Sequence, residues 1–263
     1  MIFRQLFEPE SSTYTYLFGW QDTGEALLLD PVVETIERDL QTINELGLRL
    51  AYTLDTHIHA DHISSACRLR ALTDCKVAYP AQDDLPCADI GVTEDRPLNL
   101  GGLNFRPLFT PGHTDTHHCY LLDQGGQQRV FTGDALLIDG CGRTDFQNGD
   151  TVALYRSVHD KIFTLPPDTL VYPAHDYQHR HVSTVAQERE RNPRLNDAIR
   201  LEEFEDIMTN LDLAYPKKNR CGGTGQPQMW RLPRRCRGTT SSNWRQVPPG
   251  LAELGSGSVK LPP

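Results

Sequence analysis

The sequence predicts an α/β protein in which two β-sheets pack together and carry helices on their outer faces. Short apolar runs typical of strands fill two separate parts of the chain, and segments with helical periodicity follow each of them. Strands and helices in this order favour a layered sandwich of two mixed sheets. The length of 263 residues suits one large domain, or a domain with an appendage.

The first half of the chain reads as strands followed by strand and helix pairs. The opening strands are expected at residues 2–7, 14–20 and 26–29. Residues 34–46 have helical periodicity and end at Gly47, a residue typical of helix C-caps. The apolar run 48–54 predicts a buried strand, and residues 63–72 predict a helix.

The second half repeats this organisation. A short strand is expected at residues 76–80, and two more within 88–109. Strand-like residues 119–122 and 128–131 flank Gln124-Gly125-Gly126, which predicts a hairpin. The remaining expected elements are helices at 152–161, 182–191 and 201–210 and a strand at 170–172.

Residues 217–263 differ from the preceding chain in composition. They are rich in Gly, Pro, Ser and Arg and have no strand or helix periodicity, so we expect a domain at 1–216 and a largely disordered tail at 217–263. The tail holds nine Lys or Arg and one acidic residue, whereas residues 1–216 hold 17 basic and 34 acidic residues. An acidic domain argues against nucleic acid as the main partner.

The apolar runs are too short to span a bilayer, so no membrane partner is expected. The N-terminal residues resemble neither a secretory signal nor a transit peptide, which predicts a cytoplasmic protein. The seven cysteines form no Cys-x-x-Cys pair, and their odd number predicts free thiols in a reducing compartment.

The segment Thr56-His57-Ile58-His59-Ala60-Asp61-His62 carries the strongest functional pattern, with four potential metal ligands in six residues. It lies between a predicted strand and a predicted helix. Residues two apart in an extended chain point the same way, so His57 and His59 should project together. Asp61 is expected to cap the following helix, with His62 in its first turn.

Three more ligand candidates each follow a strand-like run, just past Gly or Pro: His113, Asp134 and His175. Small or rigid residues there allow the backbone to approach an ion closely. The combined pattern predicts a metal site and allows two arrangements. Two ions could be held by His57, His59 and His113 and by Asp61, His62 and His175, with Asp134 bridging. Alternatively, one Fe(II) takes two His and one carboxylate and keeps open positions.

The order of these motifs resembles the metallo-β-lactamase fold, an αββα sandwich. The segment Gly140-Cys141-Gly142-Arg143-Thr144-Asp145-Phe146-Gln147 narrows the resemblance to the glutathione-dependent persulfide dioxygenases. Glyoxalase II enzymes have a triplet similar to Cys141-Gly142-Arg143, whereas the following Thr-Asp-Phe-Gln discriminates between the two groups. The resemblance covers residues 1 to about 216.

This resemblance implies one Fe(II) per chain, bound by His57, His113 and Asp134. His59, Asp61, His62 and His175 then surround the ligands and orient them. The implied reaction converts glutathione persulfide, O2 and water to sulfite and glutathione, and a homodimer is compatible with it. Three residues are candidates for the substrate side: Arg143 for an anionic group, Tyr177 as a hydroxyl donor, and Cys141.

Some of these residues also have purely structural interpretations. Arg143 could instead form an ion pair with Asp145, Tyr177 could be a packed aromatic, and Cys141 could fill space. At the level of function, the alternatives are a binuclear thioester hydrolase of the glyoxalase II kind and a non-catalytic binding module of the same fold.

Overall fold

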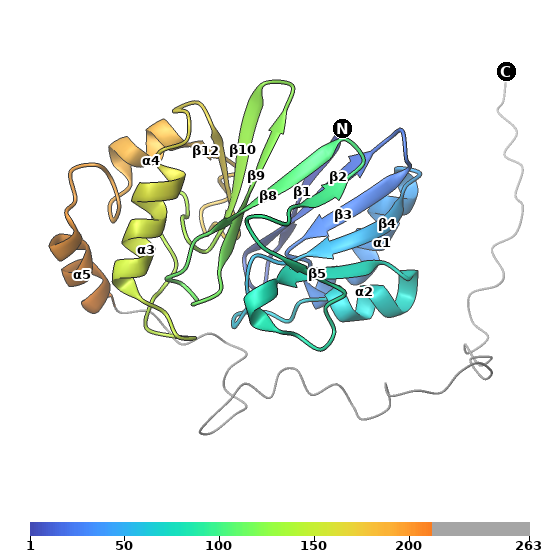
Figure 1. The fold of residues 1–263 in the computed structure, drawn as a ribbon, viewed down its shortest axis with the longest axis horizontal. Coiled ribbons are helices and arrows are strands. Elements are labelled where there is room, and N and C mark those ends of the chain that lie inside the picture. Colours follow the sequence, from blue (N-terminus) through green and yellow to red (C-terminus); the bar gives the residue numbers. More distant parts are fainter. Residues whose placement is uncertain (212–263) are drawn as a thin grey trace, which may run out of the picture. The chain divides into compact units, whose positions relative to one another are not determined.

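The computed structural model describes residues 1–211, so the predicted tail at 217–263 lies outside the described residues. Two six-stranded sheets form the centre of the described chain (Figure 1). The first sheet contains, in spatial order, β1 (Ile2–Glu8), β2 (Thr13–Trp20), β3 (Glu25–Leu29), β4 (Arg49–Leu54), β5 (Lys76–Pro80) and β6 (Ile90–Val92). Strands β1 to β3 are antiparallel and β3 to β6 are parallel, so the sheet is mixed.

The second sheet is mixed as well. Its spatial order is β12 (Ser183–Thr184), β11 (Leu170–Pro173), β10 (Gln127–Gly133), β9 (His118–Gln124), β8 (Leu103–Phe109) and β7 (Leu98–Leu100). Strands β10 and β11 run parallel, and the other neighbours run antiparallel. The predicted hairpin joins β9 to β10, and its Gly125 and Gly126 have φ of 63° and 80°, which glycine adopts without strain.

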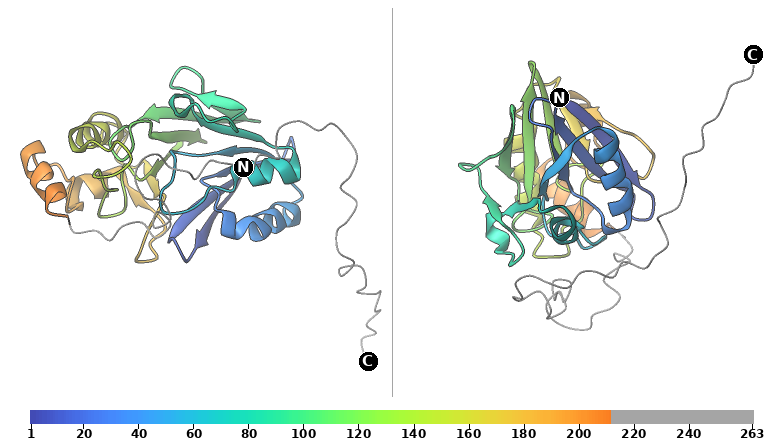
Figure 2. Two further views of the ribbon diagram at one scale, coloured as in Figure 1. Left: turned by 90° about the horizontal axis from the view of Figure 1, so that it is seen from below. Right: turned by 90° about the vertical axis from the view of Figure 1, so that its right-hand side faces the viewer.

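Helices cover the outer face of each sheet, as the two views of Figure 2 also show. Helices α1 (Ile36–Glu45) and α2 (Ala66–Thr73) pack on the first sheet through a cluster that includes Leu28, Ile43 and Leu69. Helices α3 (Thr151–Ser157), α4 (Val185–Arg191) and α5 (Leu201–Thr209) pack on the second. The predicted αββα sandwich is therefore confirmed. Among residues 1–211, no helix is long and apolar enough to cross a bilayer.

The core between the sheets is aromatic. Phe18 of the first sheet meets Phe105 and Phe131 of the second edge-on, with ring centroids 4.8 and 5.0 Å apart. Edge-on pairs of this kind stabilise a core beyond the burial of their apolar area. This packing fixes one sheet against the other, and therefore fixes the loops that leave both sheets at one end of the sandwich.

Several predicted elements differ from the structure in their boundaries. Residues 88–109 hold three strands rather than two, because the Gly101-Gly102 turn folds the short β7 back on β8 against the Trp20 ring. A helix was predicted from residue 182, but residues 183–184 pair with β11 and α4 starts at Val185. A five-residue π-helical turn, Val158–Ile162, continues α3, and the predicted helix at 152–161 spans both.

The cysteines depart from the expectation of free thiols. Cys67 of α2 and Cys87, which precedes β6, form a disulfide with their Cα atoms 6.3 Å apart. This pair could not be predicted from the sequence, because the two cysteines are 20 positions apart and meet only when α2 packs beside the chain that follows β5. Cys75, Cys119 and Cys141 are free and buried.

Candidate metal centre

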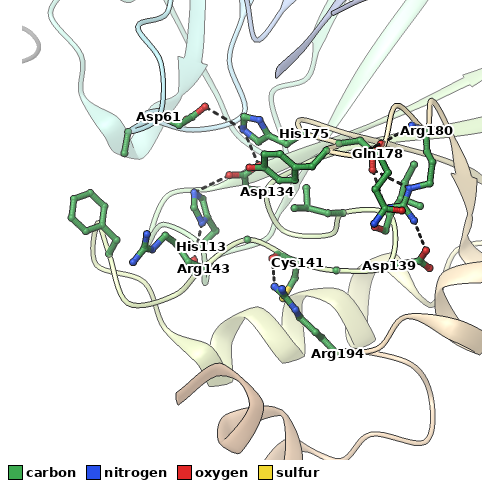
Figure 3. Close-up of a pocket in the computed structure, with 18 of the residues that line it drawn as sticks. Asp61, His113, Asp134, Asp139, Cys141, Arg143, His175, Gln178, Arg180 and Arg194 are labelled. Carbon is green, nitrogen blue, oxygen red and sulfur yellow. Dashed lines mark hydrogen bonds and ion pairs between the residues drawn. The ribbon is translucent and has the colours of Figure 1, made fainter. Parts of the chain in front are cut away.

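Strand ends from both sheets bring the predicted ligands together. His57 follows β4 of the first sheet, whereas His113, Asp134 and His175 follow β8, β10 and β11 of the second. Figure 3 shows Asp61, His175, Asp134 and His113 in a chain of polar contacts along one wall of a pocket. The candidate ligands at these strand ends therefore lie close together in the structure, as the sequence pattern predicted.

His57 presents one nitrogen that is free to bind a metal. Asp30 accepts hydrogen bonds from the Thr56 backbone N–H at 2.7 Å and from its hydroxyl at 3.1 Å. Because that hydroxyl donates to Asp30, it accepts from His57 Nδ1, which lies 2.8 Å away. Nε2 then keeps its lone pair, and among the described residues it has no hydrogen-bond partner. Burial and neighbouring imidazoles hold the pKa of His57 well below its usual value, so the ring stays neutral.

His113 is oriented in the same way. Its Nδ1 donates to the carbonyl oxygen of Arg143 at 2.8 Å, so Nε2 carries the lone pair and lies 3.3 Å from Asp134 Oδ2. One ligand atom each of His57, His113 and Asp134 lies within 4.8 Å of the others. First-row metal ions hold nitrogen and oxygen at about 2.0–2.2 Å, so these three groups fit around one ion after small adjustments.

A second group of side chains lies beside this triad. His62 Nδ1 is 2.9 Å from Asp61 Oδ2, and His175 Nε2 is 3.4 Å both from Asp61 Oδ2 and from Asp134 Oδ1. Burial lowers the pKa of His175, but the two carboxylates outweigh burial and raise it. The predicted capping role of Asp61 is wrong: α2 starts at Ala66, and Asp61 faces these two imidazoles instead.

His59 is turned toward buried carboxylates. Its Nε2 lies 3.1 Å from Asp30 and 3.6 Å from Asp55, whereas its ring centroid is 4.1 Å from that of His57. Burial lowers the pKa of His59, but the hydrogen bond to Asp30 and the surrounding acids raise it to about 9. The two rings project side by side as predicted. His59 groups with Asp61 and His62, or with Asp30 and Asp55, but not with the triad.

A cavity of about 490 Å³ opens beside the triad. The side next to the triad is formed by Asp61, His113, Asp134 and His175. Its other walls carry three cationic residues, Arg143, Arg180 and Arg194. A site with carboxylates and imidazoles on one side and guanidinium groups on its other walls suits a small anionic substrate that reacts at a metal.

The comparisons with known proteins agree with this geometry. Residues 9–175 match the metallo-beta-lactamase superfamily. The human mitochondrial persulfide dioxygenase ETHE1 is 46% identical over 230 residues, which cover 84% of this chain and 89% of that protein. The chain belongs to the persulfide dioxygenase family. The crystal structure of ETHE1 from Myxococcus xanthus is 51% identical with a TM-score of 0.78, and the match covers 82% of this chain and 94% of that one.

Hydrolases of the same superfamily are more distant. A hydroxyacylglutathione hydrolase of Albidiferax ferrireducens is 36% identical over 174 residues, or 66% of each chain. The family and enzyme class expected from the Gly140 to Gln147 segment are therefore confirmed.

Two substrate-side candidates of this persulfide dioxygenase lie at the pocket. Arg143 forms the predicted ion pair with Asp145, through two hydrogen bonds of 2.7 Å. Tyr177 is 72% exposed at the pocket wall, with its ring parallel to that of His175 at a centroid distance of 6.3 Å.

The third candidate, Cys141, turns its thiol away from the triad. Its Sγ lies 3.8 Å from the sulfur of Met208 on α5, and burial raises the pKa of the thiol to about 11. A neutral thiol in the helix layer fills space, whereas the Cys141 backbone carbonyl accepts a hydrogen bond from Arg194 at 2.9 Å.

Two residues of this persulfide dioxygenase site were missed in the sequence. Arg194 lines the pocket, and within residues 1–211 no carboxylate lies at ion-pair distance from it. Its segment, Asn192-Pro193-Arg194-Leu195, also resembles the persulfide dioxygenases, and that resemblance could have suggested the role. His117 contacts the backbone of Asp134, and nothing local in Thr116-His117-His118 indicates that role.

Proposed function

We propose that this protein oxidises glutathione persulfide with O2 and water at one Fe(II) held by His57, His113 and Asp134. The observation that carries the proposal is the grouping of two imidazoles and one carboxylate within 4.8 Å, with His57 Nε2 buried and unpartnered among the described residues. Two His and one carboxylate on one side of Fe(II) leave the other side open. When bound, the Fe(II) supplies the electrons that activate O2.

The reaction balances without another reductant. The terminal sulfur of the persulfide receives both atoms of O2 and one oxygen from water, which gives sulfite, and the inner sulfur leaves as the thiol of glutathione. Sulfur is oxidised and O2 is reduced. Asp61 and His175 lie beside Asp134 on the pocket wall, where they can hold water and accept the protons that hydrolysis releases.

Cationic groups in the pocket suit the carboxylates of glutathione. Arg194 donates to the Cys141 carbonyl and also interacts with the Cys141 thiol. None of the ion pairs in the described part of the chain involves Arg194, so its remaining N–H groups can bind an anion. Arg143 is held by Asp145, whose side chain is 65% exposed and can yield to a substrate carboxylate. We assign Arg194 as the stronger anchor, with Arg143 and the exposed Tyr177 hydroxyl nearer the metal end.

Oxygen uptake tests the proposal directly. Protein loaded with Fe(II) in the absence of oxygen should bind about one iron per chain, and should consume O2 and form sulfite when glutathione persulfide is added. Asp134→Ala should lose both iron and turnover, whereas Arg194→Gln should keep iron and show a raised KM. Oxygen uptake that does not depend on persulfide would contradict the dioxygenase proposal. So would the absence of oxygen uptake in protein with a full content of iron.

One observation favours a second candidate, a binuclear thioester hydrolase. His59 Nδ1 and His62 Nε2 are also buried without hydrogen-bond partners among the described residues, and Asp61 lies between His62 and His175. A second ion could use this group. Hydrolysis of lactoylglutathione by protein containing two ions per chain, without persulfide-dependent oxygen uptake, would establish the hydrolase instead.

The proposal extends to location and assembly. A cytoplasmic enzyme was predicted from the N-terminal residues, whereas the human relative is described as mitochondrial. Localisation of the tagged full chain in its own cells checks the first point. Light scattering of the purified protein tests the homodimer with which the resemblance is compatible.

A further inference from the structure

We propose that His117 is a positioning residue, whose imidazole Nε2 holds the backbone of Asp134 and so aims the Asp134 carboxylate at the metal. The inference rests on the proposed role of Asp134 as a ligand and adds a residue outside the predicted ligand set. His117 follows Thr116 in the loop before β9 and is completely buried. Its ring centroid is 5.0 Å from that of His57 and 6.3 Å from that of His113.

The contacts of His117 fix its tautomer. The backbone N–H of Asp134 points at Nε2, with a nitrogen-to-nitrogen distance of 3.2 Å. A backbone amide can only donate, so Nε2 must carry the lone pair and the ring proton must lie on Nδ1. Nδ1 is 3.0 Å from the Thr110 hydroxyl, which therefore accepts that proton. The opposite tautomer would place two N–H groups against each other.

The Thr110 hydroxyl can accept this bond because its own proton has other partners. Its oxygen accepts the backbone N–H of Cys119 at 3.0 Å, and lies 3.2 Å from the Cys119 sulfur and 3.3 Å from the Leu108 carbonyl oxygen, either of which can accept its proton. Burial, with the neighbouring imidazoles, holds the pKa of His117 well below its usual value, which agrees with a neutral ring. The network is complete with one tautomer only.

Gly133 allows the ring to approach this closely. Its φ is +50°, and a Cβ at this position would lie 2.5 Å from His117 Nε2 and 2.9 Å from Thr56 Oγ1. Only a residue without a side chain fits between Asp134 and the His117 imidazole at position 133. His117 does not line the pocket; it packs beside the rings of His57 and His113, and its hydrogen bond to the metal site runs to the backbone of Asp134.

Loss of the acceptor would leave the buried Asp134 N–H unpaired, which is unfavourable unless the backbone moves. Movement of the backbone would misplace a carboxylate that must meet His57 and His113 at one point. Groups that orient metal ligands typically change affinity about 10- to 100-fold when they are removed. We therefore expect His117 to control metal affinity more than folding.

Two amide variants separate the acceptor from the bulk of the ring. In His117→Gln the side-chain oxygen reaches the position of Nε2, whereas in His117→Asn the amide reaches only the position of Nδ1. Co(II), titrated into metal-free protein against a chromophoric chelator, serves as the probe, and its visible absorption bands report ligand geometry. We expect His117→Asn to weaken Co(II) binding by about tenfold or more and to alter the absorption bands. The Co(II) affinity of His117→Gln should stay within about threefold of the wild type.

Controls exclude a general packing effect. His118→Asn changes the next residue, which is buried and packs against the Phe109 ring at a tilt, and should leave Co(II) affinity unchanged. The melting temperature of both metal-free His117 variants should fall by similar amounts. Equal weakening of Co(II) binding in His117→Asn and His117→Gln, or no weakening in His117→Asn, would overturn the proposed role of His117 Nε2 as an acceptor. Co(II) binding that survives in Asp134→Ala would instead overturn the ligand site, and this inference with it.

A measurement on the unmodified protein covers the case in which a variant does not fold. Long-range nitrogen–proton NMR of the imidazoles in Zn(II)-loaded protein distinguishes the two tautomers. Our inference requires a neutral His117 protonated on Nδ1. A proton on Nε2 would rule it out, because the Asp134 amide would then have no acceptor.

Discussion

His113 and Arg143 are joined by a hydrogen bond of 2.8 Å from the imidazole Nδ1 to the arginine carbonyl. The residue whose guanidinium lines the pocket therefore also orients a proposed metal ligand, but through its backbone. The two roles are separable because a side-chain substitution leaves the carbonyl in place. This separation gives a direct test of the substrate role.

Arg143→Gln should keep iron content within the error of the wild type and lower kcat/KM for glutathione persulfide about tenfold, since it loses one charge-assisted hydrogen bond to an anion. Arg156→Gln, an exposed residue on α3, is the matched control. Steady-state oxygen uptake and metal analysis on the same preparations provide both readouts. A fall in iron equal to the fall in kcat/KM would mean that Arg143 acts on the metal site instead.

Asp134→Ala and His59→Ala should differ in metal affinity. Asp134 offers a carboxylate within 4.8 Å of the His57 and His113 ligand atoms, whereas His59 holds Asp30 through its Nε2. We expect Asp134→Ala to lose most of its iron, and His59→Ala to lose affinity only by the roughly 10- to 100-fold typical of an orienting group. Iron titration of both variants decides this point, and equal losses would make His59 a direct ligand.

The sequence predicted the convergence of ligands because the relevant residues follow strands, and strand ends of packed sheets meet at one edge. His57, His113, Asp134 and His175 were all placed correctly for this reason. The role of Asp61 was mispredicted, because the chain bends at residues 60–62 and bridges from Ser64 to Val32 before the helix begins. Ser65 N–H bonds to the Pro31 carbonyl there, and this contact between distant segments delays α2.

His117 could not be predicted for a related reason. Its function depends on the distance from Nε2 to the amide of Asp134, 17 residues further along the chain, and on the absence of a Cβ at Gly133. Local periodicity carries no information about either contact. Side chains that act on a backbone across the fold are visible only once the strands are paired.

Asp83→Asn should stabilise the protein at neutral pH. Burial raises the pKa of Asp83 to about 6 from an unfolded value of 3.8, although a hydrogen bond to Thr116 partly opposes this shift. A raised folded pKa means that the folded state binds more protons than the unfolded state between pH 3.8 and about 6, so stability falls as pH rises through that window. Above it the full penalty persists, which after solvent screening we place at about 1 kcal/mol.

The asparagine removes this penalty because it is isosteric and uncharged. Its melting temperature at pH 7 should rise by about 2–4 °C, and its stability should change less between pH 4 and 6 than that of the wild type. Asp84→Asn, at the exposed neighbouring position, is the control. Identical pH profiles for the wild type and Asp83→Asn would contradict a raised pKa at this site.

Gly142→Ala should disrupt the metal centre although it adds a single methyl group. A Cβ at position 142 would lie 2.5 Å from the carbonyl oxygen of Asp134 and 2.8 Å from His113 Nδ1. Gly142 also donates its backbone N–H to that Asp134 carbonyl at 2.8 Å. The glycine of the Cys141-Gly142-Arg143 segment is therefore required by close approach to two proposed ligands.

Neither neighbour of Gly142 can move freely, since one is backbone and the other is held by its own hydrogen bond. Overpacking of this kind typically costs about 1–3 kcal/mol, and we expect a lower melting temperature together with at least about a tenfold loss of iron affinity. Gly140→Ala is the matched control, because its Cβ would meet no atom closer than 3.9 Å. Thermal unfolding and iron titration should separate the two substitutions. Equal behaviour of Gly142→Ala and Gly140→Ala would show that this segment does not hold the Asp134 and His113 side chains in place.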